Sequence, residues 1–229
     1  MNRKPLVLGL TALVLIIVAL AVFYFVRATP DVPQRAAHPT PAETTTQRNN
    51  DTTGQGQLTR FHSPSIGPRT APVTIVEFFD PSCEACRAFY PEVKRIMADY
   101  PESVRLVLRY VLFHRGSEEV TRILETARRQ DLYEPVLEAV LLAQPAWHDD
   151  PQVIAAWEAA AAAGLDVERA RAEMMDSSID AVLETDMNDA KAVGIRGTPT
   201  FFVNGTELRR LGPAPLRALV EEKIEQVAE

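Results

Sequence analysis

The sequence is poor in cysteine and has no excess of positive charge. Only 2 of the 229 residues are cysteine, which excludes a small disulfide-stapled protein and a zinc site built from four thiolates. The net charge of −7 at pH 7 argues against nucleic acid as a partner, because phosphate backbones are bound by basic surfaces. Glycine-rich phosphate loops, dinucleotide fingerprints and nucleophilic-serine motifs are also missing, so none of those chemistries is indicated.

Histidine is scarce as well. The 4 histidines, His38, His62, His114 and His148, are scattered and show no metal-ligand spacing, so we expect neither a metal nor any other cofactor. His114 follows a strand-like run and could approach an active site, although a loop histidine with a local partner is the simpler interpretation.

What the sequence does contain is a long apolar run near its start. Residues 5–26 include no charged side chain, and as a helix they would span about 33 Å, enough for a hydrocarbon core of ~30 Å. Arg3 and Lys4 should keep residues 1–4 in the cytoplasm. We therefore expect a single-pass signal anchor in a bacterial inner membrane, with the rest of the chain in the periplasm or an equivalent extracytoplasmic space. The alternative is a signal peptide cleaved near Ala19-Leu20-Ala21, but the apolar run continues beyond that site.

A polar segment rich in proline and threonine follows over residues 27–60. Its only branched aliphatic residues are Val32 and Leu58, too few to offset the entropy that ordering would cost. We expect a disordered tether.

From residue 61 to residue 229 the pattern becomes that of a folded domain. Val73–Phe79 is a β-branched and aromatic run between Ala-Pro and Asp-Pro, which predicts a buried strand. Ser82 can cap a helix that starts at Cys83 and runs to about Tyr100. Residues 104–112 predict a second strand.

A long helical block is expected next, over about residues 117–193. Its segments are rich in alanine, and we expect breaks near Pro145, Pro151 and Gly164,.

The chain closes with a hairpin and a helix. The strand-like runs 199–203 and 206–211 flank Asn204-Gly205, a strong hairpin signal, and residues 213–228 predict an amphipathic helix. The order of strand, helix, strand, helical block, hairpin and helix predicts an α/β fold with a mixed sheet.

The informative motif is Cys83-Glu84-Ala85-Cys86. Thiols at positions i and i+3 of a helix lie on one face and can close a disulfide between Cys83 and Cys86. Cys83 lies at the expected helix N-terminus, where unpaired N–H groups favour the thiolate that attacks disulfides. Cys86, one turn further in, suits the resolving role. Metal sites also use this spacing, but a purely structural disulfide within one helical turn would brace nothing.

Two motifs together resemble the thioredoxin superfamily, and most closely its DsbA-like branch of extracytoplasmic thiol–disulfide oxidoreductases. FFDPSCEAC stands at a strand–helix junction, and GIRGTPTFFVNG precedes the last hairpin. The resemblance covers residues 61–229 and implies a thioredoxin fold with a mixed central sheet. The helical block at about 117–193 corresponds to the insertion of the DsbA-like branch.

The resemblance also gives roles to residues outside the motif. Pro199, preceded by Thr198, stands where the superfamily has a cis-proline that faces the redox pair, and this loop would pair with an extended substrate. Glu77 stands where similar proteins have an acid that relays the proton of the buried cysteine, here Cys86. The alternative is that Glu77 reaches solvent at a strand edge. Pro91 matches the proline that kinks the active-site helix.

Two features depart from the pattern of strong oxidases, which tend to have a histidine beside the second cysteine. Glu84 and Ala85 stand there instead, and a nearby carboxylate should raise the pKa of Cys83 and make the couple less oxidising. Thr198 before the proline is also found in isomerase and reductase relatives.

The expected function is thiol–disulfide exchange on exported proteins, most simply disulfide formation. A quinone-linked membrane oxidase would then regenerate the disulfide. The alternative is a reductase or isomerase kept reduced by a membrane electron donor, and the isomerase is disfavoured because the tether contains no dimerisation module. A Cu(I)-binding protein that uses both thiolates is a further alternative, although the tether is not rich in methionine or histidine.

Overall fold

The computed structural model describes residues 56–228. The expected cytoplasmic end, the expected membrane anchor 5–26 and most of the expected tether lie outside the described residues. Within the described part, no helix combines the length and apolar character that a bilayer crossing requires.

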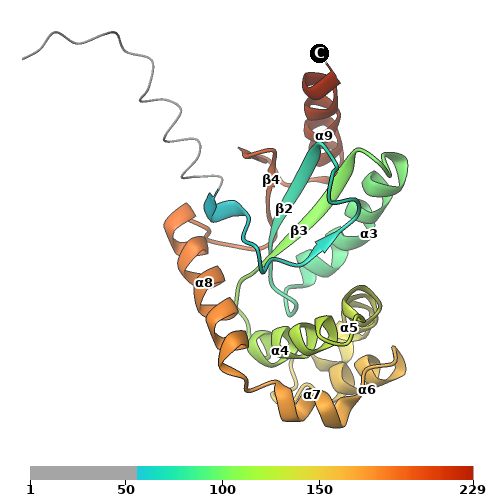
Figure 1. The fold of residues 1–229 in the computed structure, drawn as a ribbon, viewed down its shortest axis with the longest axis vertical. Helices are drawn as coiled ribbons and strands as arrows, with labels where there is room; N and C mark the ends of the chain where they lie inside the picture. Colours follow the sequence, from blue (N-terminus) through green and yellow to red (C-terminus); the bar gives the residue numbers. More distant parts are fainter. Residues whose placement is uncertain (1–55, 229) are drawn as a thin grey trace, which may run out of the picture. The chain divides into compact units, whose positions relative to one another are not determined.

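A five-stranded mixed sheet forms the centre of the domain (Figure 1). Its order is β1-β3-β2-β4-β5; β2 and β3 are parallel and the other neighbours are antiparallel. This agrees with the expected α/β fold. The strands are β1 Ser65–Ile66, β2 Val73–Phe79, β3 Val104–Tyr110, β4 Thr200–Val203 and β5 Thr206–Glu207.

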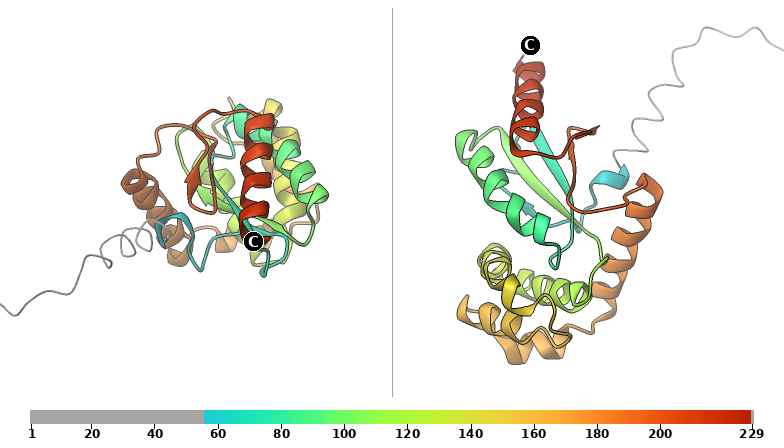
Figure 2. Two further views of the ribbon diagram at one scale, coloured as in Figure 1. Left: turned by 90° about the horizontal axis from the view of Figure 1, so that it is seen from above. Right: turned by 180° about the vertical axis from the view of Figure 1, so that it is seen from behind.

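Helices cover both faces of the sheet and form a separate layer at one end. Figures 1 and 2 show α3 and α9 on one face, α8 along the other, and α4 to α7 grouped beyond the end of the strands. The helices are α3 Glu84–Asp99, α4 Ser117–Arg128, α5 Tyr133–Trp147, α6 Ile154–Ala162, α7 Val167–Glu173, α8 Ser177–Val193 and α9 Pro213–Ala228. The expected helical insertion is therefore five helices, α4 to α8.

The side chains of β2 alternate between the two faces of the sheet, so they divide between two core clusters. Ile75 and Phe79 belong to the larger core cluster, which includes most of the buried residues of α3. Val76 and Phe78 belong to a second cluster on the other face, with Ala190 of α8. Since side chains alternate along a strand, Glu77 shares the face that α3 covers.

Several boundaries differ from the expected ones. β3 ends at Tyr110 rather than at residue 112, and β5 stops at Glu207 rather than at residue 211. β5 is an edge strand, and the last hairpin bond beyond it runs from the Leu208 N–H to the Phe201 carbonyl. Pro145 does not break a helix but lies inside α5. It stands two residues before the helix end, so its missing N–H costs a single helical bond.

The described domain begins before residue 61, inside the segment expected to be a tether. Leu58 is 7% exposed and packs in the second cluster. Arg60 makes two hydrogen bonds of 2.7 Å to the carboxylate of Asp189 on α8. The short strand β1, which pairs with β3, has two residues and is too short for a periodic pattern.

A network of buried charges anchors this first segment. Arg109 on β3 is fully buried, and its Nη2 lies 2.8 Å from Asp186 Oδ1 and 2.6 Å from Asp189 Oδ2. His62 Nε2 lies 2.8 Å from Asp186 Oδ1, and Arg60 binds Asp189. The network joins the start of the domain to the sheet and to α8.

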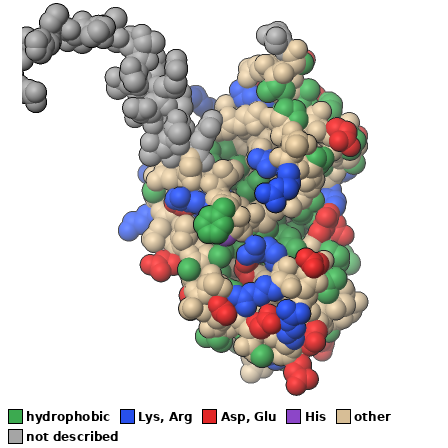
Figure 3. All heavy atoms as spheres, in the orientation of Figure 1, with side chains coloured by type: hydrophobic (Ala, Val, Ile, Leu, Met, Phe, Trp, Pro, Cys, Tyr) green, Lys and Arg blue, Asp and Glu red, His purple; other side chains and the backbone are tan. Residues whose placement is uncertain are grey.

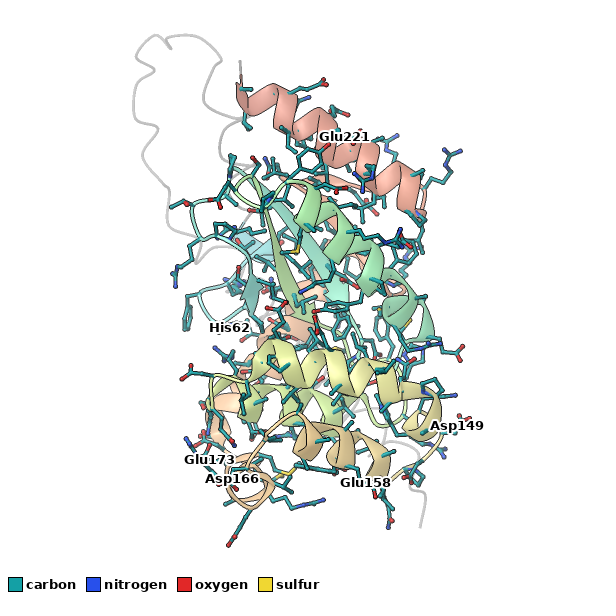
Figure 4. The ribbon with its side chains drawn as sticks, turned by 90° about the vertical axis from the view of Figure 1, so that its right-hand side faces the viewer. His62, Asp149, Glu158, Asp166, Glu173 and Glu221 are labelled. Carbon is teal, nitrogen blue, oxygen red and sulfur yellow. The ribbon has the colours of Figure 1, made fainter. Side chains whose placement is uncertain are left out.

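The outer surface carries charges of both signs. Acidic and basic side chains are intermixed on the face of the described residues shown in Figure 3. Figure 4 shows Asp149, Glu158, Asp166 and Glu173 at the outer edge of the helical insertion, away from the sheet.

Candidate active site

Cys83 is the N-cap residue of α3. Its backbone is extended, with φ −77° and ψ 120°, and its side chain is 7% exposed. Ser82, expected to cap the helix, does not do so: no side chain caps α3, and Ser82 Oγ is buried without a partner among the described residues. The N–H groups of Ala85 and Cys86 nevertheless lie near enough to the sulfur of Cys83 to contribute to lowering its pKa.

The surroundings of Cys83 favour its thiolate. Its pKa is lowered from 9.0 to about 5. The largest cause is a hydrogen bond from the Cys86 thiol; burial opposes it, and Thr198 and the N–H groups of Ala85 and Cys86 add to the lowering. A thiolate at neutral pH can attack a disulfide directly.

Cys86 has the opposite character. It is fully buried and is not bonded to Cys83 in this structure. Burial raises its pKa far above that of an ordinary thiol, and the hydrogen bond to Cys83 and the negative charge of Glu77 raise it further. Cys86 therefore remains a thiol that can donate to the sulfur of Cys83.

Glu77 lies beneath the pair and is completely buried, so it does not reach solvent at a strand edge. Neither carboxylate oxygen makes a well-formed hydrogen bond to a described residue, although the Cys86 thiol is near enough to interact. Burial, followed by the charge of Cys83, raises the pKa of Glu77 well above 4.5. Its surroundings therefore favour the protonated form.

The loop before β4 closes the site on the other side. The Thr198–Pro199 peptide is cis, and Cys83 Sγ lies 3.2 Å from the Thr198 carbonyl oxygen, to which it donates when it is a thiol. Since β4 pairs with β2, the sheet brings this loop to the end of β2. The segment between that end and α3, residues 80–83, is the redox turn, and it carries Cys83.

Glu84 does not act on Cys83 as expected. Its side chain is 70% exposed and its Oε1 lies 4.0 Å from His148 Nε2. The pKa of Cys83 is lowered rather than raised, because the thiol and N–H donors at the sulfur outweigh a carboxylate that points into solvent. Pro91 lies inside α3, where its missing N–H removes one helical bond.

Asp80 belongs to the site, although the sequence pattern marks Asp80-Pro81 only as the end of a strand. It is fully buried. Its carboxylate accepts from Ser82 N at 2.8 Å, Phe113 N at 2.9 Å and Ser117 Oγ at 2.6 Å. It also lies 2.7 Å from His114 Nδ1, so His114 is a loop histidine with a local partner. Asp80 thus ties the redox turn to the start of the insertion.

In residues 56–228, no three His, Cys, Asp or Glu side chains are grouped as a metal ion would require.

Comparison with known proteins agrees with this geometry. A family model described as thioredoxin matches residues 60–222. A thioredoxin-like oxidoreductase from Silicibacter pomeroyi DSS-3 is 26% identical, with a TM-score of 0.65 over 76% of this chain and 97% of that chain. BdbD from Bacillus subtilis is 22% identical, with a TM-score of 0.62 over 71% of this chain and 93% of that chain. A periplasmic thioredoxin-like protein from Salmonella enterica serovar Typhimurium is also 22% identical, with a TM-score of 0.59 over 76% and 97%.

Curated relatives match by sequence over a smaller share of their length. The Na(+)/H(+) antiporter NhaA of Herminiimonas arsenicoxydans is 32% identical over 143 residues, which are 62% of this chain and 22% of the antiporter. A second antiporter, NhaA 3 of Salinispora tropica, is 32% identical over 156 residues, 67% of this chain and 23% of that protein. The chain thus spans about a fifth of the length of the curated relatives it matches.

Proposed function

The chain belongs to the thioredoxin family, and we propose that it is a DsbA-like thiol–disulfide oxidoreductase that works through Cys83 and Cys86. One observation carries the proposal. Two thiols one helical turn apart are set to opposite extremes: the pKa of Cys83 is lowered to about 5, whereas that of Cys86 is raised. One sulfur is thereby the entry point for exchange, and the other remains a thiol until it resolves the intermediate.

In the oxidising direction the reaction starts from a Cys83–Cys86 disulfide. A substrate thiolate attacks the sulfur of Cys83, which forms a mixed disulfide and releases Cys86 as a thiolate that takes up a proton. A second substrate thiolate then attacks the first substrate sulfur, forms the substrate disulfide and releases Cys83 as a thiolate. Two electrons pass from the substrate to the pair. The reducing direction is the reverse sequence.

Glu77 is the proton relay in this scheme. The thiolate of Cys86 is a strong base, because burial raises the pKa of the thiol, and it needs a proton at once. Burial also raises the pKa of Glu77, which favours the protonated form that can supply this proton. In the reverse direction its carboxylate accepts the proton of Cys86 as a general base.

The loop at Thr198 and Pro199 is the proposed substrate contact. The Thr198 carbonyl lies 3.2 Å from the sulfur of Cys83, so a peptide bound along this loop would place its own cysteine near the reacting atom. Extended peptides pair with exposed backbone groups of this kind.

The low pKa of Cys83 favours the oxidising direction. A stabilised thiolate makes the reduced pair the more stable product, and thus makes the disulfide a better oxidant. A value of about 5 lies between the ~7 of thioredoxin and the ~3.5 of the strong oxidase DsbA. We propose disulfide formation as the direction, with reduction as the alternative.

The proposed setting is the extracytoplasmic side of a bacterial inner membrane. The uncharged run 5–26 supports a signal anchor,, and one structural relative is described as periplasmic. The substrates would be thiols of exported proteins. A quinone-linked membrane oxidase would restore the disulfide, or a membrane electron donor would keep the pair reduced in the alternative direction.

The reduction potential of the Cys83–Cys86 couple tests the direction. The full-length chain is equilibrated with glutathione buffers, and the dithiol fraction is measured. A potential near about −120 mV indicates a disulfide donor, whereas one near about −270 mV indicates a reductase. Oxidation of a dithiol peptide is measured in parallel, with Cys83→Ser and Cys86→Ser as controls. A chain that forms no internal disulfide, or that exchanges equally well without Cys83, contradicts the proposal.

A further inference from the structure

A glutamine of the helical insertion reaches into the redox turn. Gln144 lies on α5, which packs against α3 (Figure 1), and it is fully buried. Its Nε2 donates to the Pro81 carbonyl at 2.7 Å and to the Cys83 carbonyl at 3.0 Å. Its Oε1 accepts from Arg87 Nε at 3.0 Å. Both ends of the amide are therefore satisfied.

Arg87 fixes which way this amide points. In the opposite orientation, Oε1 of Gln144 would face two carbonyl oxygens and its NH₂ group would face a guanidinium that has only donors. All three hydrogen bonds would be lost, and buried polar groups without partners are costly. The orientation found here is the one that lets the side chain hold the turn.

The two carbonyls stand directly before the first turn of α3. The Cys83 carbonyl also accepts the first helical bond, from Arg87 N at 3.1 Å. Because a peptide unit is planar, holding this carbonyl fixes the plane of the peptide between Cys83 and Glu84. That plane sets the start of the helix, whose N–H groups at Ala85 and Cys86 interact with the sulfur of Cys83.

We propose that Gln144 is a positioning residue for thiol–disulfide exchange: its amide, oriented by Arg87, holds the carbonyls of Pro81 and Cys83 so that the helix N–H groups stay aimed at the sulfur of Cys83. The inference rests on the proposed function for its biological meaning. The insertion thereby sets the reactivity of the redox pair as well as the shape of the domain.

Gln130 offers a control within the same insertion, with the same side chain in a more exposed position. Its amide also bridges to backbone, donating to the Asp166 carbonyl at 3.2 Å and accepting from Asp166 N at 2.9 Å. These bonds join the end of α4 to the start of α7, and Asp166 lies at the outer edge of the insertion (Figure 4). Gln130→Met removes a similar clamp without touching the redox turn.

The test compares Gln144→Met with Gln130→Met in the reduced full-length chain. The pKa of Cys83 is measured from the ultraviolet absorbance of its thiolate; Cys86 does not interfere, because its pKa is raised. We expect Gln144→Met to raise the pKa of Cys83 by about 1, a tenfold fall in the ratio of thiolate to thiol. The reduction potential should become more negative as well. Gln130→Met should leave both quantities unchanged.

The inference is overturned if both variants lose thermal stability alike while the pKa of Cys83 and the potential stay at their wild-type values. Gln144 would then be a structural residue only. If Gln144→Met does not fold, Gln144→Asn is measured instead, since its shorter side chain cannot reach both carbonyls, and the same outcomes apply. The titration needs no substrate. A wild-type chain that titrates near pH 5 without exchanging thiols refutes the proposed function alone.

Discussion

Replacing Glu77 by glutamine should make the stability of this protein less dependent on pH. Glu77→Gln keeps the size of the side chain and removes its charge from a position that is completely buried and poor in hydrogen-bond partners. Burial raises the pKa of Glu77 well above 4.5. The folded chain therefore keeps a proton that the unfolded chain has already released.

The sign and size of the effect follow from proton binding. Above pH 4.5, the ordinary pKa of this side chain, the unfolded state binds fewer protons than the folded state, so the free energy of unfolding falls as pH rises. For one group the steepest fall is about 1.4 kcal/mol per pH unit. It ends where the folded carboxyl ionises. Glu77→Gln has no carboxyl to ionise, so its free energy of unfolding does not fall in this way. The difference in free energy of unfolding between Glu77→Gln and the wild type should therefore grow as the pH rises above 4.5.

Urea unfolding of the oxidised full-length chain measures the effect, since the disulfide prevents the thiols from titrating. Unfolding is followed by the fluorescence of the buried Trp147 and Trp157 between about pH 4 and about pH 8. Glu84→Gln is the control, because it removes an exposed carboxylate from the same region. A difference between Glu77→Gln and wild type that stays constant over this range would refute the reasoning.

The thiolate absorbance of the reduced chain should titrate with a midpoint near pH 5, and Cys83→Ser should lack this transition. A midpoint near 9.0, the ordinary pKa of the thiol, would contradict stabilisation of the thiolate by the Cys86 thiol. Because folding lowers this pKa, the reduced form should also lose stability progressively as the pH falls from the ordinary value of 9.0 to about 5,, which urea unfolding across that range measures. Asp80→Ala should lower the free energy of unfolding by at least about 3 kcal/mol, since it leaves several buried donors unpaired at ~1–3 kcal/mol each; a loss below ~1 kcal/mol would show that water replaces the carboxylate. Asp186→Ala should cost about 3–5 kcal/mol, because Arg109 stays buried with one partner fewer. Removing the exposed Arg169, the partner of Glu173, by Arg169→Ala should cost less than about 1 kcal/mol in the same denaturation assay.

The parts of the fold that were predicted well are those that local patterns determine. β2 has the predicted bounds because a β-branched and aromatic run between prolines has few other structures open to it. The helix after Cys83 and the hairpin turn at Asn204-Gly205 are also local signals. β5 was predicted too long, because whether a strand continues at a sheet edge depends on its neighbour and not on its own residues.

The missed residues are those whose roles arise from distant partners. Gln144 lies 61 positions from Cys83, and a single glutamine in a helical pattern normally indicates an exposed face. Asp80 meets His114 and Ser117 only when two loops are brought together. Glu84 shows the converse. It is next to Cys83 in the sequence, which predicts an effect on the sulfur, but its side chain points into solvent.

Arg60 binds Asp189 and His62 binds Asp186, and these two pairs, here called the clamp, have a mechanical consequence. A pull applied at the start of the described domain is resisted by these ion pairs, in which Arg60 is partly exposed and the other three side chains are buried, and which join it to α8 and to β3. The redox turn lies on the other face of the sheet, under α3, and is outside this load path. A load on the first described residues is therefore carried by contacts with α8 and β3, apart from those that shape the turn at Cys83.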